Sequence, residues 1–165
     1  MPYIESGEAL KYDSSILNEN ERDFLCSLPP QIEVEVNGVK FLLVHGSPRR
    51  NNEDILPDTP LKEVEKMLEG VDVDVILCGH THIPCGFQTN TKQTVVNVGS
   101  VGRPFTPEPK ACYLLIDIDE NKKCEFQHLF IDYDKETASK KLAIQNFEGA
   151  EKLALTLINP QERHF

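Results

Sequence analysis

The sequence predicts an α/β fold in which helices flank a mostly antiparallel or mixed sheet. The continuously apolar segment 41–44 is typical of a strand that is covered on both faces, and residues 71–78 predict another buried strand. A strictly alternating segment, 32–36, leads into the first of them through Asn37-Gly38, the pattern of a β-hairpin. Segments with helical spacing lie before, between and after these strands. The 165 residues suit one domain, and we expect a single domain over 1–165.

The first elements of the chain are an arm and a short helix. Residues 1–14 show no clear apolar period, so we expect an irregular lead-in. A helix is predicted over residues 18–28, because Asn18 is a good N-cap, Glu21 stands at N3, and Pro29 ends the pattern. Its apolar face comprises Phe24, Leu25 and Leu28.

The second half of the chain alternates helices and strands. Thr59 as N-cap, Pro60 at the first helical position and Gly70 just past the end predict a second helix before the 71–78 strand. A short strand is expected over 94–98, and the segments 111–118 and 124–131 are expected to pair across a turn. One or two terminal helices are expected to begin at Asp134, with an interruption at Gly149.

The charge and the cysteine content of the chain argue against some classes of partner and some cellular compartments. With 17 basic and 27 acidic residues the net charge is −10, which argues against broad binding to nucleic acids or anionic membranes. Five cysteines without C-x-x-C spacing, no signal peptide and no apolar stretch near the ~18 residues of a membrane span favour a reducing compartment. We therefore expect a cytoplasmic protein that is not exported.

Three histidines are the candidate chemical groups. His45 follows the 39–44 strand, and His80 and His82 follow the 71–78 strand, with Gly79 placed where the backbone must turn. Neutral imidazole binds Zn, Mn, Fe or Ni, and an H-x-H spacing can reach one ion or two neighbouring ions. Histidines in loops also form ordinary hydrogen bonds. Cys78 and Cys85 bracket the pair, so a closed zinc site of two thiolates and two imidazoles is a further alternative.

Three segments carry a family resemblance: Val-His-Gly-Ser-Pro at 44–48, Cys-Gly-His-Thr-His at 78–82, and Asn-Val-Gly-Ser-Val-Gly-Arg-Pro at 97–104. In this order they resemble the C-terminal half of a calcineurin-like metallophosphoesterase. The resemblance is nearest to small bacterial and archaeal phosphoesterases related to diadenosine-tetraphosphate hydrolases, and it spans most of residues 20–145. It implies a partial metallophosphoesterase-like β-sandwich with flanking helices, with the N-terminal half of the family fold absent.

The resemblance also implies a reaction, which is phosphoester hydrolysis at two divalent ions about 3.5 to 4 Å apart. By position, His45 and His80 would bind one ion and His82 the other, the ions being Mn, Fe, Zn or Ni. The substrate would be a small phosphoester. Arg49 and Arg50 directly follow the first of these segments and Arg103 lies in the third, which makes them candidate phosphate ligands, although a solvated loop charge is the more common role of such an arginine.

The chain departs from the family pattern in its missing motifs. The family's D-x-H, G-D-x-x-D and G-N-H-D/E motifs do not occur, so we identify no catalytic residue in this chain and expect little or no phosphatase activity from it alone. A truncated product, a split enzyme and a non-catalytic interaction scaffold are all compatible with this pattern. A fold with part of one sheet missing would expose an edge and an apolar face. We therefore expect self-association or an N-terminal partner fragment.

Overall fold

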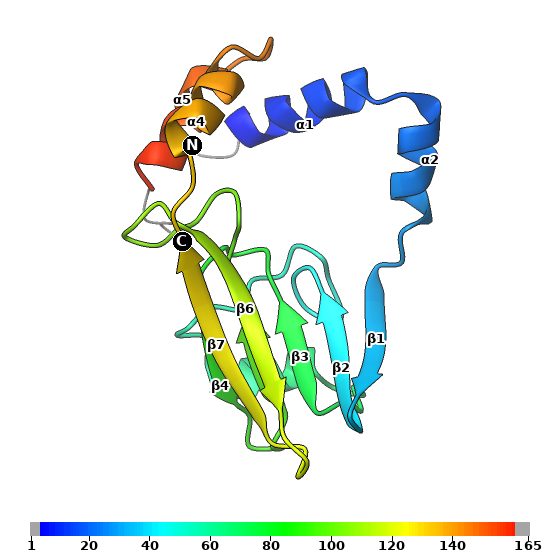
Figure 1. Cartoon of the computed structure of the whole chain (residues 1–165). Coiled ribbons are helices and arrows are strands. Elements are labelled where there is room, and N and C mark those ends of the chain that lie inside the picture. The colour runs from blue at the N-terminus through cyan, green and yellow to red at the C-terminus, as the bar shows by residue number, and fades with distance from the viewer. Residues whose placement is uncertain (1–3, 161–165) are drawn as a thin grey trace.

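The computed structural model describes residues 4–160, which form two stacked sheets with most of the helices beyond one end of the strands (Figure 1). The helices in this part of the chain are α1 (Ile4–Ile16), α2 (Glu19–Ser27), α3 (Leu61–Met67), α4 (Lys135–Ala143) and α5 (Ala150–Ile158). The strands are β1 (Gln31–Val36), β2 (Val39–Val44), β3 (Val75–Cys78), β4 (Cys85–Gln88), β5 (Thr94–Asn97), β6 (Ala111–Ile118) and β7 (Cys124–Ile131).

The larger sheet is mixed, as the sequence predicts. Its order is β1-β2-β3-β5-β4, in which β2, β3 and β5 are parallel and the two edge strands run antiparallel to their neighbours. Because parallel strands point the same way, the loops that follow β2, β3 and β5 leave the sheet at the same end. These are the loops that carry the three motif segments.

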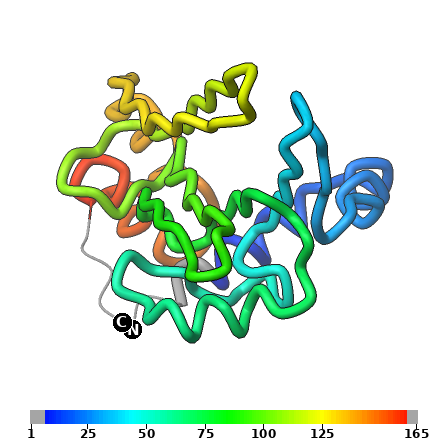
Figure 2. Tube along the Cα trace, turned by 90° about the horizontal axis from the view of Figure 1, so that it is seen from below, coloured from blue at the N-terminus to red at the C-terminus, as the bar shows by residue number. Residues whose placement is uncertain are grey.

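The second sheet consists of β6 and β7, which pair antiparallel and cover one face of the first sheet. Phe41 and Val75 of the larger sheet pack against Ile116 and Phe126 of the smaller one. The opposite face buries Leu42, Ile76 and Val95 together with Val64 of α3. Figure 2 shows the β6–β7 pair on one side of the sheet and the α3 segment on the other. The expected α/β sandwich with a mixed sheet and flanking helices is confirmed.

Local signals fixed several elements. Asn37 and Gly38 both take positive φ angles, 51° and 76°, as a two-residue hairpin turn requires. At the start of α2, the Asn18 side chain accepts from the Glu21 N–H while the Glu21 carboxylate accepts from the Asn18 N–H. Asp134 caps α4 in the expected place, and Gly149, at φ 88°, separates α4 from α5. The β6–β7 pairing also matches its prediction.

Other expectations were wrong. The supposed irregular arm is helix α1, whose Tyr12 donates a 2.9 Å hydrogen bond to Gln145 and whose ring lies 5.6 Å from that of Phe147. These partners are more than 130 residues away, so no local period announces the helix. Thr59 does not cap α3, because its hydroxyl accepts from the Leu56 N–H instead. The 71–78 strand begins only at Val75, and β4 was not predicted.

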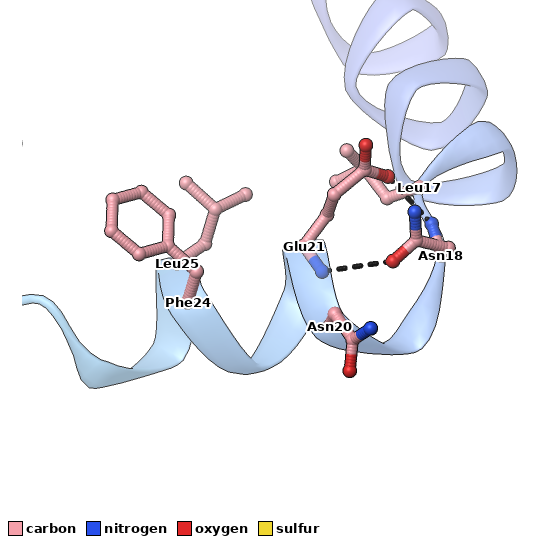
Figure 3. Close-up of a pocket in the computed structure, with 6 residues that line it drawn as sticks. All are labelled: Leu17, Asn18, Asn20, Glu21, Phe24 and Leu25. Carbon is pink, nitrogen blue, oxygen red and sulfur yellow. Dashed lines mark hydrogen bonds between the residues drawn. The ribbon is translucent and has the colours of Figure 1, made fainter.

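The face of α2 and the outer strand β1 are exposed. None of the α2 side chains is buried, and Phe24 and Leu25 are 63% and 50% exposed. They line a shallow concavity with Leu17, Asn18, Asn20 and Glu21 (Figure 3). Every residue of β1 is exposed, including Ile32 and Val34, which face the same way as the buried Phe41 of β2. The expected uncovered edge and apolar face are therefore present. Within the described residues, no helix is long and apolar enough to cross a membrane.

Candidate metal centre

The loops after β2 and β3 bring two of the three candidate histidines together. The Gly79 N–H donates a 2.8 Å hydrogen bond to the His45 carbonyl, which continues the parallel β2–β3 pairing beyond the strand ends. This contact sets the two loops side by side. As a result, Nε2 of His45 lies 3.3 Å from Nδ1 of His80, and the two rings meet edge to face with centroids 5.2 Å apart.

The other nitrogen of His80 faces an acidic residue. Its Nε2 lies 3.5 Å from Oδ1 of Asp54, in the loop between β2 and α3. His45 and Asp54 therefore approach opposite edges of one imidazole ring. The sequence did not predict a role for Asp54, because it lies directly after another acidic residue, Glu53, and no pattern between Arg50 and Ile55 distinguishes the two.

His82 has different surroundings. Its Nδ1 lies 2.7 Å from the Arg103 carbonyl, so Nδ1 carries the proton that is donated to that oxygen. Its ring packs against Phe105 with centroids 5.7 Å apart. The hydrogen bond leaves Nε2 as the lone-pair nitrogen, and a backbone carbonyl in this position is a common device for orienting a metal-binding histidine.

The loop that carries His80 and His82 has a strained backbone. Both residues take the left-handed conformation, with φ of 63° and 59°, whereas Gly79 does not. The expectation that Gly79 provides the turn is therefore wrong. A side chain in this region costs about 1 kcal/mol or more, and surrounding contacts must hold it.

Those contacts come from β5. The fully buried Asn97 donates through Nδ2 to the Gly79 carbonyl at 2.7 Å and to the Thr81 hydroxyl at 2.8 Å. Its Oδ1 accepts from the Gly99 N–H at 3.0 Å. The carbonyl of Asn97 lies 2.7 Å from Nε2 of His128 on β7. The end of β5 thus fixes the histidine loop and ties it to the second sheet.

The loop after His45 is held just as tightly. A Cβ at Gly46 would lie 2.6 Å from the Asn51 carbonyl oxygen, so only glycine fits there. The buried Ser47 hydroxyl donates to Glu53, and Arg49 forms a two-pronged pair with the same carboxylate, at 2.7 and 2.8 Å. These contacts lower the pKa of Glu53, with the Arg49 guanidinium contributing most. Arg49 is therefore committed to Glu53, while the neighbouring Arg50 is exposed.

Arg103 points toward the C-terminal helices. Its Nε donates a 3.1 Å hydrogen bond to the Thr156 hydroxyl on α5, and its guanidinium lies 5.4 Å from the centre of the Phe105 ring. This arrangement fastens the loop after β5 to α5. Phosphate binding by Arg49, Arg50 and Arg103 stays a prediction.

The described residues contain no group of three or more histidine, cysteine, aspartate or glutamate side chains placed to hold one ion. Cys78 is buried and its pKa is raised to about 12, mainly by burial, so the zinc alternative of two thiolates gains no support. His45, His80 and Asp54 fail to converge because His80 would have to offer both of its nitrogens to one ion. Metal binding by His45, His80 and His82 stays a prediction.

The comparison with protein families decides the family. Residues 11–121, more than half of the chain, match the model of the calcineurin-like phosphoesterase superfamily domain. The chain belongs to the calcineurin-like phosphoesterase superfamily. The family resemblance drawn from the three motif segments is therefore confirmed.

The proteins that this chain resembles are longer than the chain itself. An uncharacterized protein from Methanocaldococcus jannaschii is 26% identical over 150 residues, which cover 81% of this chain and 58% of that protein. The fold resembles a hypothetical protein from Pyrococcus horikoshii, with a TM-score of 0.72, 22% identity, and coverage of 95% of this chain and 67% of the other. It also resembles a metallophosphoesterase from Sphaerobacter thermophilus, with a TM-score of 0.71, 19% identity, and coverage of 87% and 62%. The chain thus spans 58% of the length of the first of these proteins and 62% of the length of the last.

Proposed function

We propose that this phosphoesterase-superfamily chain supplies the imidazole ligands of a two-metal centre for phosphoester hydrolysis, and that a partner segment supplies the rest. The observation that carries the proposal is the 3.3 Å separation of His45 Nε2 and His80 Nδ1. Two nitrogen ligands about 2.1 Å from one tetrahedral ion lie about 3.4 Å apart. This contact is a hydrogen bond, so one of the two nitrogens carries a proton that an ion would displace to solvent, and the ion could then join the two imidazoles without movement of β2 or β3.

The second ion is assigned to His82. The Arg103 carbonyl fixes the proton on its Nδ1 and leaves Nε2 available for a metal. This donor set of neutral imidazoles suits Mn, Fe, Zn or Ni. One imidazole cannot hold an ion firmly by itself, so carboxylates from outside the described residues are needed.

A pair of bound divalent ions would supply Lewis-acid stabilisation of the phosphoryl oxygens and a water of lowered pKa. The chain's own residues hold and orient these ions. The Asn97 hydrogen bonds and the His45–Gly79 contact fix the loops, so the imidazoles need little rearrangement on binding. Arg50, exposed beside this loop, is the arginine we propose to meet the substrate phosphate. The substrate is a small phosphoester.

The uncovered surface supports a partner of different sequence. If β1 of two copies paired antiparallel with apolar side chains opposed, Glu33 and Glu35 would meet glutamates of the other copy. The net charge of −10 on each copy would add to this repulsion. A separate segment that brings acidic metal ligands to the centre and apolar side chains to this surface avoids both conflicts at β1.

Metal titration of the purified chain tests the proposal. We expect weak binding of Mn²⁺ or Zn²⁺ by calorimetry, loss of that binding in His45→Ala and His80→Ala, and its retention in the matched control His128→Gln. Hydrolysis of p-nitrophenyl phosphate and its diester should be negligible for the chain alone. If the His45 and His80 variants bound metal as well as the wild type does, the proposal would be contradicted. Full hydrolysis of these substrates by the chain alone would contradict it as well.

A non-catalytic interaction scaffold is the second candidate function. The absence of a three-ligand group in residues 4–160 favours it, as do the exposed apolar side chains of α2 and β1. The two functions differ in one measurement. A scaffold would bind its partner equally well with His45, His80 and His82 all replaced by alanine, whereas the enzyme would require these imidazoles for metal binding and turnover.

A further inference from the structure

We infer that the exposed apolar face of α2 is a docking site for a basic amphipathic helix of a partner protein. The face consists of the half-buried Leu17 and the exposed Phe24, Leu25 and Leu28. The carboxylate of Glu21 stands among these apolar side chains. The partner helix would pack its own apolar side chains on this face and place a lysine or arginine beside Glu21. The inference goes beyond the proposed function, because it requires neither a bound metal nor hydrolysis.

Helix α2 has an apolar face but no element packed against it. None of its side chains is buried, and no other helix or strand of residues 4–160 packs on it. Figure 1 shows α2 apart from both sheets, on the chain between α1 and β1. Its nine residues are fewer than the about 12–15 that an isolated helix needs in water, and helices in proteins gain most of their stability from packing of an apolar face. A helix packed on α2 would supply that stabilisation.

The spacing of the apolar side chains fits a helical occupant. Phe24 and Leu28 are four residues apart, and Glu21 precedes Phe24 by three, so these side chains share one side of α2. Figure 3 shows Leu17, Glu21, Phe24 and Leu25 on this side and Asn20 on the other. An apolar stripe of this kind takes a second helix by side-chain packing. A strand would gain less, because the backbone groups of α2 are already paired within the helix.

The charges around the face favour a basic occupant. Residues 17–36 contain five acidic residues and one basic residue, Arg22. The Arg22 side chain donates hydrogen bonds to the carbonyl oxygens of Ser14 and Leu17, which directs its charge to the end of α1. The Glu21 carboxylate is held by the capping box and lines the concavity. A lysine or arginine on the partner helix would therefore meet an acid that is already in place.

A second copy of the chain fits this face less well. In a two-fold pairing the same acidic surface would meet itself, and each copy carries a net charge of −10. Nucleic acids and anionic membranes are negatively charged as well and would be repelled in the same way. A basic helix is attracted by the charge and covers the apolar side chains.

Binding of two model peptides to the full chain tests the inference. The first is a fluorescein-labelled peptide of about 14 residues, or about four helical turns, with leucine at helical spacing and lysine elsewhere. In the second peptide, glutamate replaces every lysine. By fluorescence anisotropy in EDTA, the lysine peptide should bind at one per chain and about 10-fold or more tightly than the glutamate peptide. NMR amide signals of Phe24 and Leu25 should shift on binding.

Three variants separate the charge from the apolar contact. Glutamine at position 21 can keep the capping hydrogen bond, so Glu21→Gln should leave α2 folded and weaken binding of the lysine peptide about 2- to 5-fold. Phe24→Ser/Leu25→Ser should weaken it about 10-fold or more, since it removes the centre of the contact. The matched control is Glu19→Gln, which makes the same change of net charge on the side of α2 away from Phe24. It should change binding less than about 2-fold.

Several results would overturn the inference. Equal binding of the two peptides would show that charge does not select the occupant. Unchanged binding in Phe24→Ser/Leu25→Ser would show that the lysine peptide binds elsewhere on the acidic chain. Dimerisation of the wild type that is lost in this double variant would make a second copy the occupant. Because EDTA removes divalent ions, failure of the proposed metal centre would leave these results unchanged, and failure of peptide binding would leave the metal centre standing.

Discussion

The side-chain amide of Asn97 donates a 2.8 Å hydrogen bond to the hydroxyl of Thr81, which lies between His80 and His82. Both partners are 0% exposed, so this bond is shielded from water and joins the end of β5 to the middle of the histidine loop. It explains how His80 and His82, on either side of Thr81, are held in the left-handed backbone conformation.

Asn97→Ala should destabilise the protein by about 3 kcal/mol, because it removes three buried hydrogen bonds and leaves their backbone and hydroxyl partners unsatisfied. Urea unfolding measures the loss. The control is Asn90→Ala on an exposed turn, which should change stability by less than about 0.5 kcal/mol. Equal stability of the two variants would show that the β5 contact does not hold the loop.

Gly99→Ala should also destabilise strongly, by about 2 to 4 kcal/mol. Gly99 has a φ of 79°, and a Cβ there would lie 2.7 Å from Sγ of Cys112. Adding Cys112→Ala should restore part of the loss, since it removes the Sγ contact but leaves the Cβ of residue 112 at 3.0 Å and the backbone strain. Gly102→Ala, where a Cβ meets nothing within 4 Å, is the matched control and should be nearly neutral. Full recovery of the lost stability in the double variant would show that backbone strain at residue 99 contributes nothing.

The Glu53 contacts should make stability depend on pH in the acid range. Arg49 and Ser47 lower the pKa of Glu53 in the folded protein below its ordinary value of 4.5, so folding favours the ionised carboxylate. The stability difference between wild type and Glu53→Gln should be constant above about pH 4.5 and shrink as the pH falls through the lower folded-state pKa. Urea unfolding from pH 7 to pH 3 measures it. If the stability difference between wild type and Glu53→Gln grew toward low pH, folding would raise the pKa of Glu53 and not lower it.

The double variant Phe24→Ser/Leu25→Ser should leave the stability of the chain within about 0.5 kcal/mol of wild type, because neither side chain is buried. It should reduce association with a partner segment or with a second copy, measured by sedimentation at matched concentrations. Asn18→Ala provides the contrast, since loss of the capping box should cost about 1 kcal/mol without altering the apolar surface. Unchanged association in the double variant would exclude this face as the interface.

Cysteine alkylation at pH 8 should separate the thiols by burial. Cys26 is exposed on α2 and should react quickly with iodoacetamide, whereas Cys78 is 1% exposed and burial raises its pKa to about 12. Only the thiolate is nucleophilic, so Cys78 should react only after unfolding. Mass spectrometry of the labelled protein, native and in urea, gives the order. Fast native labelling of Cys78 would indicate that the β3 end opens.

The strongest sequence signals were those in which neighbouring residues decide the structure. Asn37-Gly38 specified the hairpin, and Asn18 with Glu21 specified the start of α2, because turn and capping energies are local. The apolar runs of β2 and β3 located strands whose ends carry His45 and His80. The motif segments were also sufficient to identify the superfamily.

Only the tertiary structure decided which atoms face one another. The helical state of α1 depends on Tyr12 meeting Gln145, and the exposure of the α2 face depends on what lies opposite it. Asp54 lies against His80, which is 26 positions away in the sequence, and Arg103 lies against Thr156, which is 53 positions away. The physical reason is that a side chain's chemistry is inherent in its residue type, whereas its partner depends on how the chain packs. The sequence therefore showed which imidazoles are available, and the fold determined which nitrogen of His80 faces His45.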